Sequence, residues 1–282
     1  MPCRLGGLAC GKTHLLYSWL MTTALVTGAS RGIGRALAQT LASYGHDVVL
    51  VARDADALSR VGRELGNRYG VKVSALPADL AARDDLTVVA EAAATADILV
   101  NNAGAALGAP FSRTAWDGDR NNENSMLALN VTAPTRLIHA ALPRMRERGF
   151  GRILNIGSVA GTGPVWAAST YGPSKAYLLG LTQSLALSSE IRASNVRLTC
   201  LVLGHAVSEF HEKAGLPPSP RMLTLPTRFV ADTAVRAIHR RRPPIVYIPG
   251  VRYKVLNFLL AHVPGGLTRI PGLVTDLSIV EK

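Results

Sequence analysis

The chain has 282 residues, of which 48% are hydrophobic and 18% are charged. This size and composition fit a single α/β domain with a sizeable buried core. The formal net charge of +12 raises the question of nucleic-acid binding, but no zinc-finger spacing or RNA-binding motif accompanies it. We therefore expect no nucleic-acid partner, and expect the positive charge to favour cofactor phosphates and anionic membrane surfaces.

The cysteines and the first residues bear on location. Cys3, Cys10 and Cys200 have neither paired metal spacing nor a disulfide framework, which predicts a reducing, cytoplasmic setting. No apolar run reaches the roughly 20 residues needed to span a bilayer. Residues 1–20 lack the hydrophobic region and cleavage site of a targeting signal, so we expect a disordered extension, or an over-long reading frame, before Met21.

From residue 22 onward, short apolar runs alternate with amphipathic stretches of helix length. In chain order the pattern predicts strand 23–27, a glycine turn at 28–34, helix 35–44, strand 46–52, helix 56–69, strand 73–78, helix 84–94, strand 98–101, helix 124–148, strand 152–156, helix 171–189 and strand 196–202. This alternation favours right-handed βαβ units and therefore one α/β domain, a doubly wound and mostly parallel sheet with helices on both faces. We assign that domain to residues 22–250.

Residues 205–227 contain four prolines and predict irregular structure. In a doubly wound fold, a segment after a late strand lies near the crevice at the carboxyl ends of the strands, where ligands bind. Two interpretations remain open at this point, a lid over a substrate and a plain surface loop.

A glycine-rich turn joins the first strand to the first helix. Its sequence, Thr-Gly-Ala-Ser-Arg-Gly-Ile-Gly at residues 27–34, permits a tight bend and lets a pyrophosphate approach the backbone at a helix N-terminus. The spacing of its glycines resembles the cofactor motif of the short-chain dehydrogenase/reductase family, and the resemblance runs from about residue 22 to 210. It implies a Rossmann-type fold and assigns these turn residues to the cofactor: Gly28, Ser30, Arg31, Gly32, Ile33 and Gly34.

Two arginines indicate which cofactor the chain binds. NAD-selective folds usually end the second strand with an acidic residue that holds the ribose hydroxyls, whereas this strand ends with Arg53. Arg31 projects from the glycine turn toward the same region. Planar guanidinium groups pair well with a 2′-phosphate, so we expect NADP(H) in preference to NAD(H). The alternative is that both are solvated surface arginines.

The ends of the third and fourth strands add further motifs. Asp79 and Leu80 are similar to the family's pair that holds the adenine amino group and packs against the ring. Asn101-Asn102-Ala103-Gly104 resembles the family's N-N-A-G motif, which implies that Asn102, Ala103 and Gly104 line the cofactor. Any one motif could be an ordinary strand-end turn, but their order and spacing together are specific.

Tyr171 and Lys175 stand four residues apart on a predicted helix and therefore share one face. Reduction of a carbonyl leaves an alkoxide that needs a proton, and a tyrosine can supply it. The reference pKa of tyrosine is near 10, and we expect the nearby ammonium to favour the phenolate. The resemblance implies that Tyr171 is the proton-transfer residue and that Lys175 hydrogen-bonds the nicotinamide ribose. It also assigns both Tyr171 and Lys175 to the cofactor site.

Two more residues complete the catalytic set that the resemblance implies. Ser158, at the end of the preceding strand, corresponds to the family's serine that polarises the substrate carbonyl. Asn130 matches the asparagine that holds a relay water near the lysine. Three neighbours are predicted to be structural instead: Gly157, Ser174 and Tyr177.

The sequence departs from the family pattern after the last predicted strand. Leu203-Gly204 stands where the family usually has Pro-Gly, so cofactor affinity and loop geometry are in doubt there. The resemblance still assigns Gly204 and Val207 to the cofactor, and Ser208 replaces a threonine that contacts the carboxamide. His205 and His211 have no acidic or cysteine partners, so we expect no metal site.

Residues 251–282 form a predicted amphipathic tail. Helix 252–263 would place five apolar residues on one stripe beside basic residues: Val255, Leu256, Leu259, Leu260 and Val263. The stripe fits a helix that covers the sheet or a subunit interface, and the family resemblance suggests a homodimer or homotetramer. The alternative is a peripheral helix that lies in a membrane surface.

The sequence therefore predicts an NADP(H)-dependent oxidoreductase that moves a hydride between the nicotinamide and a carbonyl or secondary alcohol. A lipophilic or acyl-type small molecule is the expected substrate. The alternatives are a non-catalytic protein that senses the cofactor or acts as a scaffold, and a nucleotide-sugar epimerase. Intact Tyr171 and Lys175 argue against the first, and the glycine spacing argues against the second.

Overall fold

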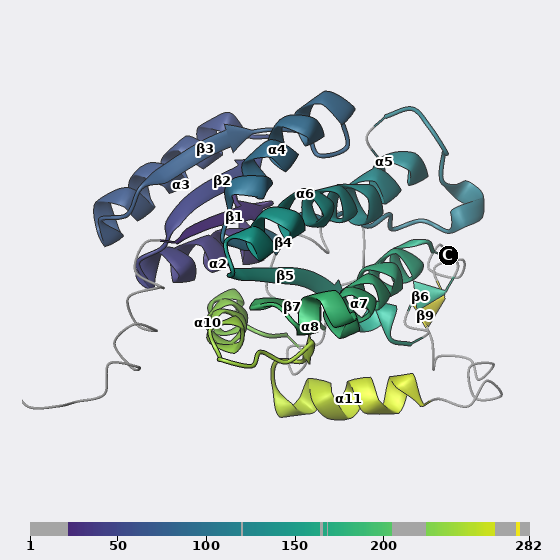
Figure 1. The fold of residues 1–282 in the computed structure, drawn as a ribbon. Helices are drawn as coiled ribbons and strands as arrows, with labels where there is room; N and C mark the ends of the chain where they lie inside the picture. The colour runs from purple at the N-terminus through teal and green to yellow at the C-terminus, as the bar shows by residue number, and fades with distance from the viewer. Residues whose placement is uncertain are drawn as a thin grey trace, which may run out of the picture.

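The computed structural model describes residues 22–119, 121–163, 166–167, 169–204, 224–262 and 275–276 (Figure 1). Its main sheet has seven strands in the order β3-β2-β1-β4-β5-β7-β8, and every neighbouring pair is parallel. The strands are β1 Thr23–Thr27, β2 Asp47–Ala52, β3 Val73–Pro77, β4 Ile98–Asn101, β5 Gly151–Ser158, β7 Val196–Leu203 and β8 Val246–Tyr247. The predicted doubly wound parallel sheet is confirmed.

Helices cover both faces of this sheet because successive strand residues point to opposite sides. In β1, Ala24 and Val26 face one hydrophobic cluster and Leu25 faces the other. The first cluster packs under α2 Gly32–Ser43, α3 Ala55–Tyr69 and α10 Thr227–Ile238. The second packs under α4 Arg83–Thr95, α6 Ala133–Glu147 and α7 Tyr171–Leu187. Burial on both faces explains the near-continuous apolar strands.

The strand order reverses beside β1, which lies between β2 and β4. A reversal of this kind opens a crevice at the carboxyl ends of the strands, where ligands of doubly wound folds bind. The glycine turn follows β1 and the N-N-A-G residues follow β4, so the parallel register brings both motifs to this crevice.

The helical stretch predicted at 124–148 is confirmed, but it is not a uniform α-helix. The structure has α5 Glu123–Leu127, a π-helical turn η2 at Ala128–Thr132, and then α6. A π-helical turn inserts an extra residue per turn, and such turns are frequent at functional sites. Asn130 lies within this one, and its side chain turns away from the helix to bond the backbone of Ala105.

Two further boundaries differ from the prediction. The helix predicted at 171–189 ends at Leu187, because Ser188 is extended and its hydroxyl accepts the Ile191 N–H at the start of α8 Ser189–Arg192. The sequence also gave no prediction for α10, which begins after Pro226 and packs against α2. Short 3-10 turns occupy η1 Phe111–Arg113 and η3 Val159–Gly161.

The predicted tail contains α11 Val251–Ala261 and the short strand β9 Thr275–Asp276, which pairs in parallel with β6 Trp166–Ala167. The proposed single apolar stripe is wrong, because Leu256 packs toward the core while Val255 and Leu259 are exposed. Tyr253 sets this rotation, since its ring is 1% exposed. Leu260 and Val263 fall outside the described side chains. Within the described part of the chain, no helix is long and apolar enough to cross a membrane.

Candidate active site

The glycine turn is shaped as a cradle. Gly28 has a φ of +67°, a left-handed conformation that side chains rarely adopt. A Cβ at Gly34 would lie 2.1 Å from the carbonyl oxygen of Gly28, so the turn closes on itself only with glycine there. Arg31 precedes α2 in an extended conformation and gives that helix no side-chain cap. Backbone N–H groups at the start of α2 therefore remain for an anionic ligand.

Asn102 fastens the turn to the end of β4. Its side-chain Nδ2 donates to the carbonyl oxygen of Thr27 at 2.8 Å, and its backbone N–H donates to Thr27 Oγ1 at 2.9 Å. The N–H of Ala103 shares the same hydroxyl at 3.0 Å. These bonds hold the two predicted cofactor motifs at a fixed separation across the crevice.

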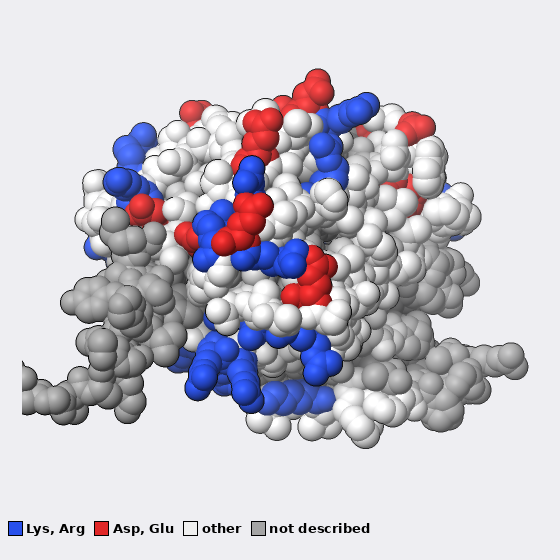
Figure 2. Space-filling model, viewed as in Figure 1, with Lys and Arg blue, Asp and Glu red and all other residues white. Residues whose placement is uncertain are grey.

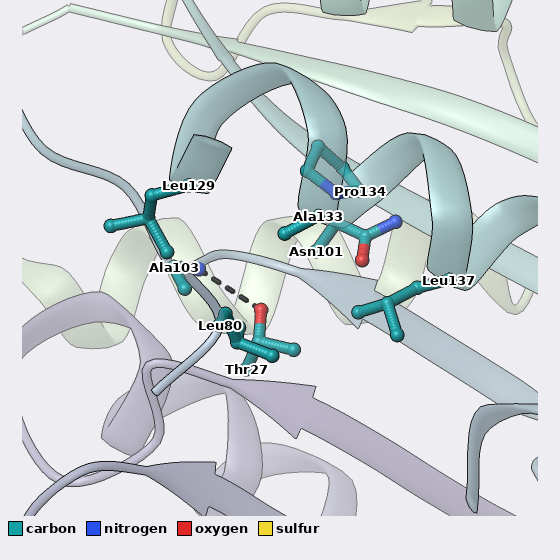
Figure 3. Close-up of a pocket in the computed structure, with 8 residues that line it drawn as sticks. All are labelled: Thr27, Leu80, Asn101, Ala103, Leu129, Ala133, Pro134 and Leu137. Carbon is teal, nitrogen blue, oxygen red and sulfur yellow. Dashed lines mark hydrogen bonds between the residues drawn. The ribbon is translucent and has the colours of Figure 1, made fainter. Parts of the chain in front are cut away.

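A small pocket lies beside this junction (Figure 3). Side chains from the strand ends face side chains of η2 and α6 across it: Thr27, Leu80, Asn101, Ala103, Leu129, Ala133, Pro134 and Leu137. Asn101 Oδ1 is buried here without a hydrogen-bond partner, although its Nδ2 donates to Asn155. The glycine cradle at the start of α2 fits the pyrophosphate of a dinucleotide, the group that the sequence predicts there.

The two arginines lie at the same edge of the sheet. β1 and β2 pair in parallel, and the N–H of Ala29 donates to the carbonyl oxygen of Val51 at 3.1 Å. Arg53 therefore lies next to the glycine turn that carries Arg31, and both side chains are exposed. Asp79 lies one strand further along, where its Oδ1 accepts the N–H of Ala81.

Tyr171 is the first residue of α7, and Lys175 follows one turn later. Each is only 6% exposed, and Lys175 Nζ lies 5.8 Å from the centre of the Tyr171 ring. Lys175 Nζ also donates to the carbonyl oxygen of Ile156 at 3.1 Å, which fixes the ammonium at the end of β5.

Burial shifts the pKa values of Tyr171 and Lys175 in opposite directions, because it penalises the charged form of each side chain. It raises the pKa of Tyr171 to about 12, although a hydrogen bond with Ser158 opposes the rise. It lowers the pKa of Lys175 to about 8, a shift that the nearby Cys200 opposes. Burial thus outweighs the expected lowering of the tyrosine pKa by the ammonium. At neutral pH the phenol is protonated and the lysine is charged.

Asn130 and Ser174 support this pair from the side. Asn130 Nδ2 donates to Ser174 Oγ at 3.1 Å, and that hydroxyl donates to the carbonyl oxygen of Tyr171 at 2.7 Å. A Cβ at Gly104 would lie 3.1 Å from Asn130 Oδ1 and 3.2 Å from Lys175 Nζ. The N-N-A-G turn therefore approaches both polar groups closely, and Ser174 links the Asn130 amide to the first turn of α7.

Ser158 ends β5 and faces Tyr171. Its Oγ accepts the N–H of Ala160 at 3.1 Å, which orients the hydroxyl at the start of η3. Gly157, predicted to be structural, lies against β7, because a Cβ there would be 2.7 Å from Cys200 Sγ. The structure thus gathers Asn130, Ser158, Tyr171 and Lys175 at one end of the sheet.

Some predicted positions are not gathered in this way. Val207, Ser208, His205 and His211 lie outside the described residues, and so does most of the proposed lid. Gly204 makes its close approach to Tyr253 of α11, since a Cβ there would lie 1.7 Å from the tyrosine Cε1. Among the described residues, no group of three or more His, Cys, Asp or Glu side chains is placed to hold a metal ion.

Sequence reasoning missed Glu123, a buried carboxylate in the first turn of α5 that is 2% exposed. Its Oε1 accepts the hydroxyl of Thr114 at 2.7 Å, and its Oε2 accepts the hydroxyl of Thr170. Thr170 directly precedes Tyr171, so Glu123 ties the segment after β4 to the start of α7. No sequence motif marks this residue, because its two side-chain partners come from two separate segments of the chain.

Comparison with known proteins agrees with this geometry. The short chain dehydrogenase family profile matches residues 22–216. A short-chain dehydrogenase from Sphingobium yanoikuyae, solved with NADPH, superimposes with a TM-score of 0.75 at 34% identity, over 89% of this chain and 97% of its own. An alcohol dehydrogenase from Comamonas testosteroni, specific for bulky-bulky ketones, gives a TM-score of 0.70 at 28% identity, over 93% and 99% of the two chains.

A curated relative points the same way. The rhamnolipids biosynthesis 3-oxoacyl-[acyl-carrier-protein] reductase of Pseudomonas aeruginosa is 39% identical over 185 residues, which is 61% of this chain and 69% of the relative. The chain belongs to the short chain dehydrogenase family of oxidoreductases. The predicted family resemblance and Rossmann-type fold are thereby confirmed.

Proposed function

We propose that the chain is an NADP(H)-dependent oxidoreductase that reduces a carbonyl compound to the alcohol, or runs the reverse reaction. The observation that carries the proposal is the buried pair of Tyr171 and Lys175, with Ser158 and Asn130 beside it at the carboxyl edge of the sheet. Buried titratable groups with perturbed pKa values in a ligand crevice are typical of catalytic sites.

When bound, NADPH supplies a hydride to the carbonyl carbon. Tyr171 donates its phenolic proton to the oxygen that becomes the alcohol. Burial keeps the phenol protonated but raises its pKa to about 12, so the transfer depends on a neighbouring positive charge that stabilises the phenolate. Ser158 holds the same oxygen by a hydrogen bond and stabilises its developing charge. In the oxidative direction Tyr171 takes the proton instead, which requires the phenolate.

The charged Lys175 stabilises the phenolate that forms as Tyr171 gives up its proton. Asn130 acts as a positioning residue, since its amide connects the loop at Ala105 with Ser174 beneath the tyrosine. A proton relay from solvent to Lys175 past Asn130 would reprotonate the tyrosine between turnovers.

NADP(H) is the cofactor that the charge of the site supports. Arg31 and Arg53 are both exposed at the edge where the adenosine ribose would lie, and no acidic residue ends β2. Guanidinium groups pair well with a 2′-phosphate. The solved short-chain dehydrogenase from Sphingobium yanoikuyae contains NADPH, which supports the same choice.

A lipophilic or acyl-type carbonyl compound is the proposed substrate class. The support comes from relatives, since the Pseudomonas aeruginosa protein is a 3-oxoacyl reductase and the Comamonas testosteroni enzyme acts on bulky ketones. We further propose that the protein is cytoplasmic and forms a homodimer or homotetramer. Analytical ultracentrifugation would test the oligomeric state. No observation favours a non-catalytic cofactor sensor.

Mixing the purified chain with NADPH and a panel of short, bulky and 3-oxoacyl ketones tests the reaction, with loss of NADPH absorbance as the measurement. Tyr171→Phe should lower kcat by about 100-fold or more, because it removes the general acid. Tyr177→Phe is the matched control, since that exposed phenol lies on the same helix and its hydroxyl bonds Thr135.

The cofactor preference is measured in the same assay by comparing NADPH with NADH. Arg53→Asp should shift the preference toward NADH, because it replaces the guanidinium with a carboxylate. Absence of turnover with every ketone, together with no effect of Tyr171→Phe, would contradict the proposed reaction. A native preference for NADH would contradict the role given to the two arginines.

A further inference from the structure

The outer face of α11 is apolar although it points to solvent. Four of its side chains are largely exposed: Val251 at 75%, Val255 at 56%, Phe258 at 62% and Leu259 at 58%. With 3.6 residues per turn, these four positions fall within a sector of about 100° around the helix axis. We call these four residues the α11 apolar face. Its arrangement is the reverse of an ordinary surface helix, which presents polar residues outward.

The inner side of the helix fixes this orientation. Tyr253 is 1% exposed and packs with Val159, Cys200 and Val202. Its ring fills the space above Gly204, where a Cβ would lie 1.7 Å from it. On the same side, Asn257 Oδ1 accepts the hydroxyl of Thr162 at 2.6 Å. The helix therefore cannot rotate to bury its apolar face without giving up these contacts.

Basic residues border the α11 apolar face. On the helical wheel Arg252 lies just beyond Leu259 and Lys254 just before Phe258, so one cation flanks each edge of the sector. Arg240, Arg241 and Arg242 are exposed in the connection that leads from α10 toward this helix. Residues 224–262 contain seven Lys or Arg and one Asp. Figure 2 shows the blue side chains gathered along this lower edge of the molecule.

We propose that the α11 apolar face lies in the surface of an anionic lipid bilayer, with the flanking cations at the headgroups. An apolar sector bordered by basic side chains is the pattern of helices that lie in a membrane interface. The charge also discriminates between occupants. A second copy docked symmetrically on this face would bring two strongly basic surfaces together, whereas anionic headgroups complement them. The inference does not depend on the proposed reaction.

Co-sedimentation of the full chain with vesicles tests the proposal. One set consists of phosphatidylcholine alone, and the other of an equal mixture of phosphatidylcholine and phosphatidylglycerol. We expect binding to the mixed vesicles, little binding to the neutral ones, and weakening by added salt. No cofactor or ketone is present, so this result is independent of enzymatic turnover.

Two double variants separate the apolar and the basic contributions. Arg252→Gln with Lys254→Gln should lower partitioning onto the mixed vesicles by about 30-fold, since each basic residue near an anionic surface contributes roughly a fivefold factor. Phe258→Ser with Leu259→Ser should lower it by about tenfold or more. The thermal midpoint of each variant is measured as well, so that a loss of folding is distinguished from a loss of vesicle binding.

Matched controls carry the same substitutions elsewhere. Arg60→Gln with Arg63→Gln alters exposed cations on α3, and Val88→Ser with Leu187→Ser alters apolar residues that are 51% and 59% exposed. Both controls should bind vesicles like the native chain. The proposal is overturned if the native chain does not bind the mixed vesicles. It is also overturned if the control variants lose vesicle binding as much as the α11 variants do. Loss of a dimer in the Phe258 and Leu259 variant, without vesicle binding by the native chain, would assign the face to a second copy.

Discussion

Tyr171 and Lys175 lie one helical turn apart, and burial moves their pKa values in opposite directions. The spacing of the two residues is visible in the sequence, but the sign of the tyrosine shift is not. Burial depends on Ala160, Met126 and the loop after β4, which pack around the phenol only in the folded chain. Glu123 escapes sequence analysis for the same reason, since its partners Thr114 and Thr170 are brought together by folding.

These pKa values predict how the rate of ketone reduction depends on pH. Tyr171 stays protonated up to about pH 12, so it can act as an acid throughout the neutral range. Lys175 loses its proton above about pH 8, and the phenolate formed in the reaction then lacks its stabilising charge. We expect kcat with saturating NADPH to be constant near neutrality and to fall as the pH rises through about 8.

The dependence of kcat on pH is measured by following NADPH absorbance across the alkaline range. Tyr177→Phe is the control variant and should show the same pH dependence as the native chain. A rate that stays level well above the pKa of Lys175 would show that the ammonium is not needed. The rate of the oxidative reaction should at first rise as the pH increases, because that reaction requires the phenolate form of Tyr171.

At the scale of elements, α11 is held to the end of β7 by one complementary contact. The Tyr253 ring occupies the space that a side chain at position 204 would need, which leaves 1.7 Å between a Cβ there and Cε1. The sequence-based expectation was that Gly204 leaves room for the cofactor. In the structure, Gly204 instead makes room for the Tyr253 ring. Leu203, which stands where the family usually has proline, is 5% exposed and packs in the core.

Gly204→Ala should lower the free energy of unfolding by about 1–3 kcal/mol, because the new methyl group overpacks the contact. Tyr253→Ala should cost about 3–5 kcal/mol through the cavity that it leaves. With Tyr253→Ala already present, Gly204→Ala should cost almost nothing. Urea unfolding of the two single variants and the double variant measures the coupling, and strictly additive losses would contradict a direct contact.

At the scale of the whole molecule, a histidine pair joins residues far apart in the chain. His46 Nε2 lies 2.8 Å from His239 Nε2, and His46 Nδ1 lies 2.6 Å from the Thr22 hydroxyl. His239 Nδ1 must donate to the carbonyl oxygen of Val235, so its Nε2 accepts the proton of His46 Nε2 when both rings are neutral. If His239 took up a proton, its Nε2–H would face the Nε2–H of His46, and the hydrogen bond between the two rings would be lost.

This pair predicts a loss of stability in acid. Burial, reinforced by His239, lowers the pKa of His46 from 6.5 to about 4, and burial also lowers the pKa of His239. The unfolded chain therefore takes up a proton at a pH where the folded chain does not. The free energy of unfolding should decline as the pH falls from about 6.5 to about 4.

Urea unfolding at a series of pH values within that window measures the slope. His46→Gln should flatten it, because it removes the group with the largest difference between folded and unfolded states. His139→Gln is the control, since that histidine is exposed on α6 and should leave the slope unchanged. Equal slopes for the native chain and His46→Gln would contradict the assignment.

The sequence by itself determined the family, the parallel sheet, and the order of the motifs along the crevice. It could do so because strand and helix periodicity and the turn residues are local properties, and parallel strands always end at one edge. The π-helical turn within the helix at 124–148 was missed because it forms around the contacts of Asn130 with Ala105, which is distant in sequence.

Only the tertiary structure decided which groups are buried and which helix face is exposed. The tail pattern predicted one apolar stripe, whereas Tyr253 on Gly204 rotates α11 so that Val251 and Phe258 face outward. The sign of the Tyr171 pKa shift follows from the same kind of long-range packing. Burial is a property of all the elements that surround a residue, and no local pattern contains that information.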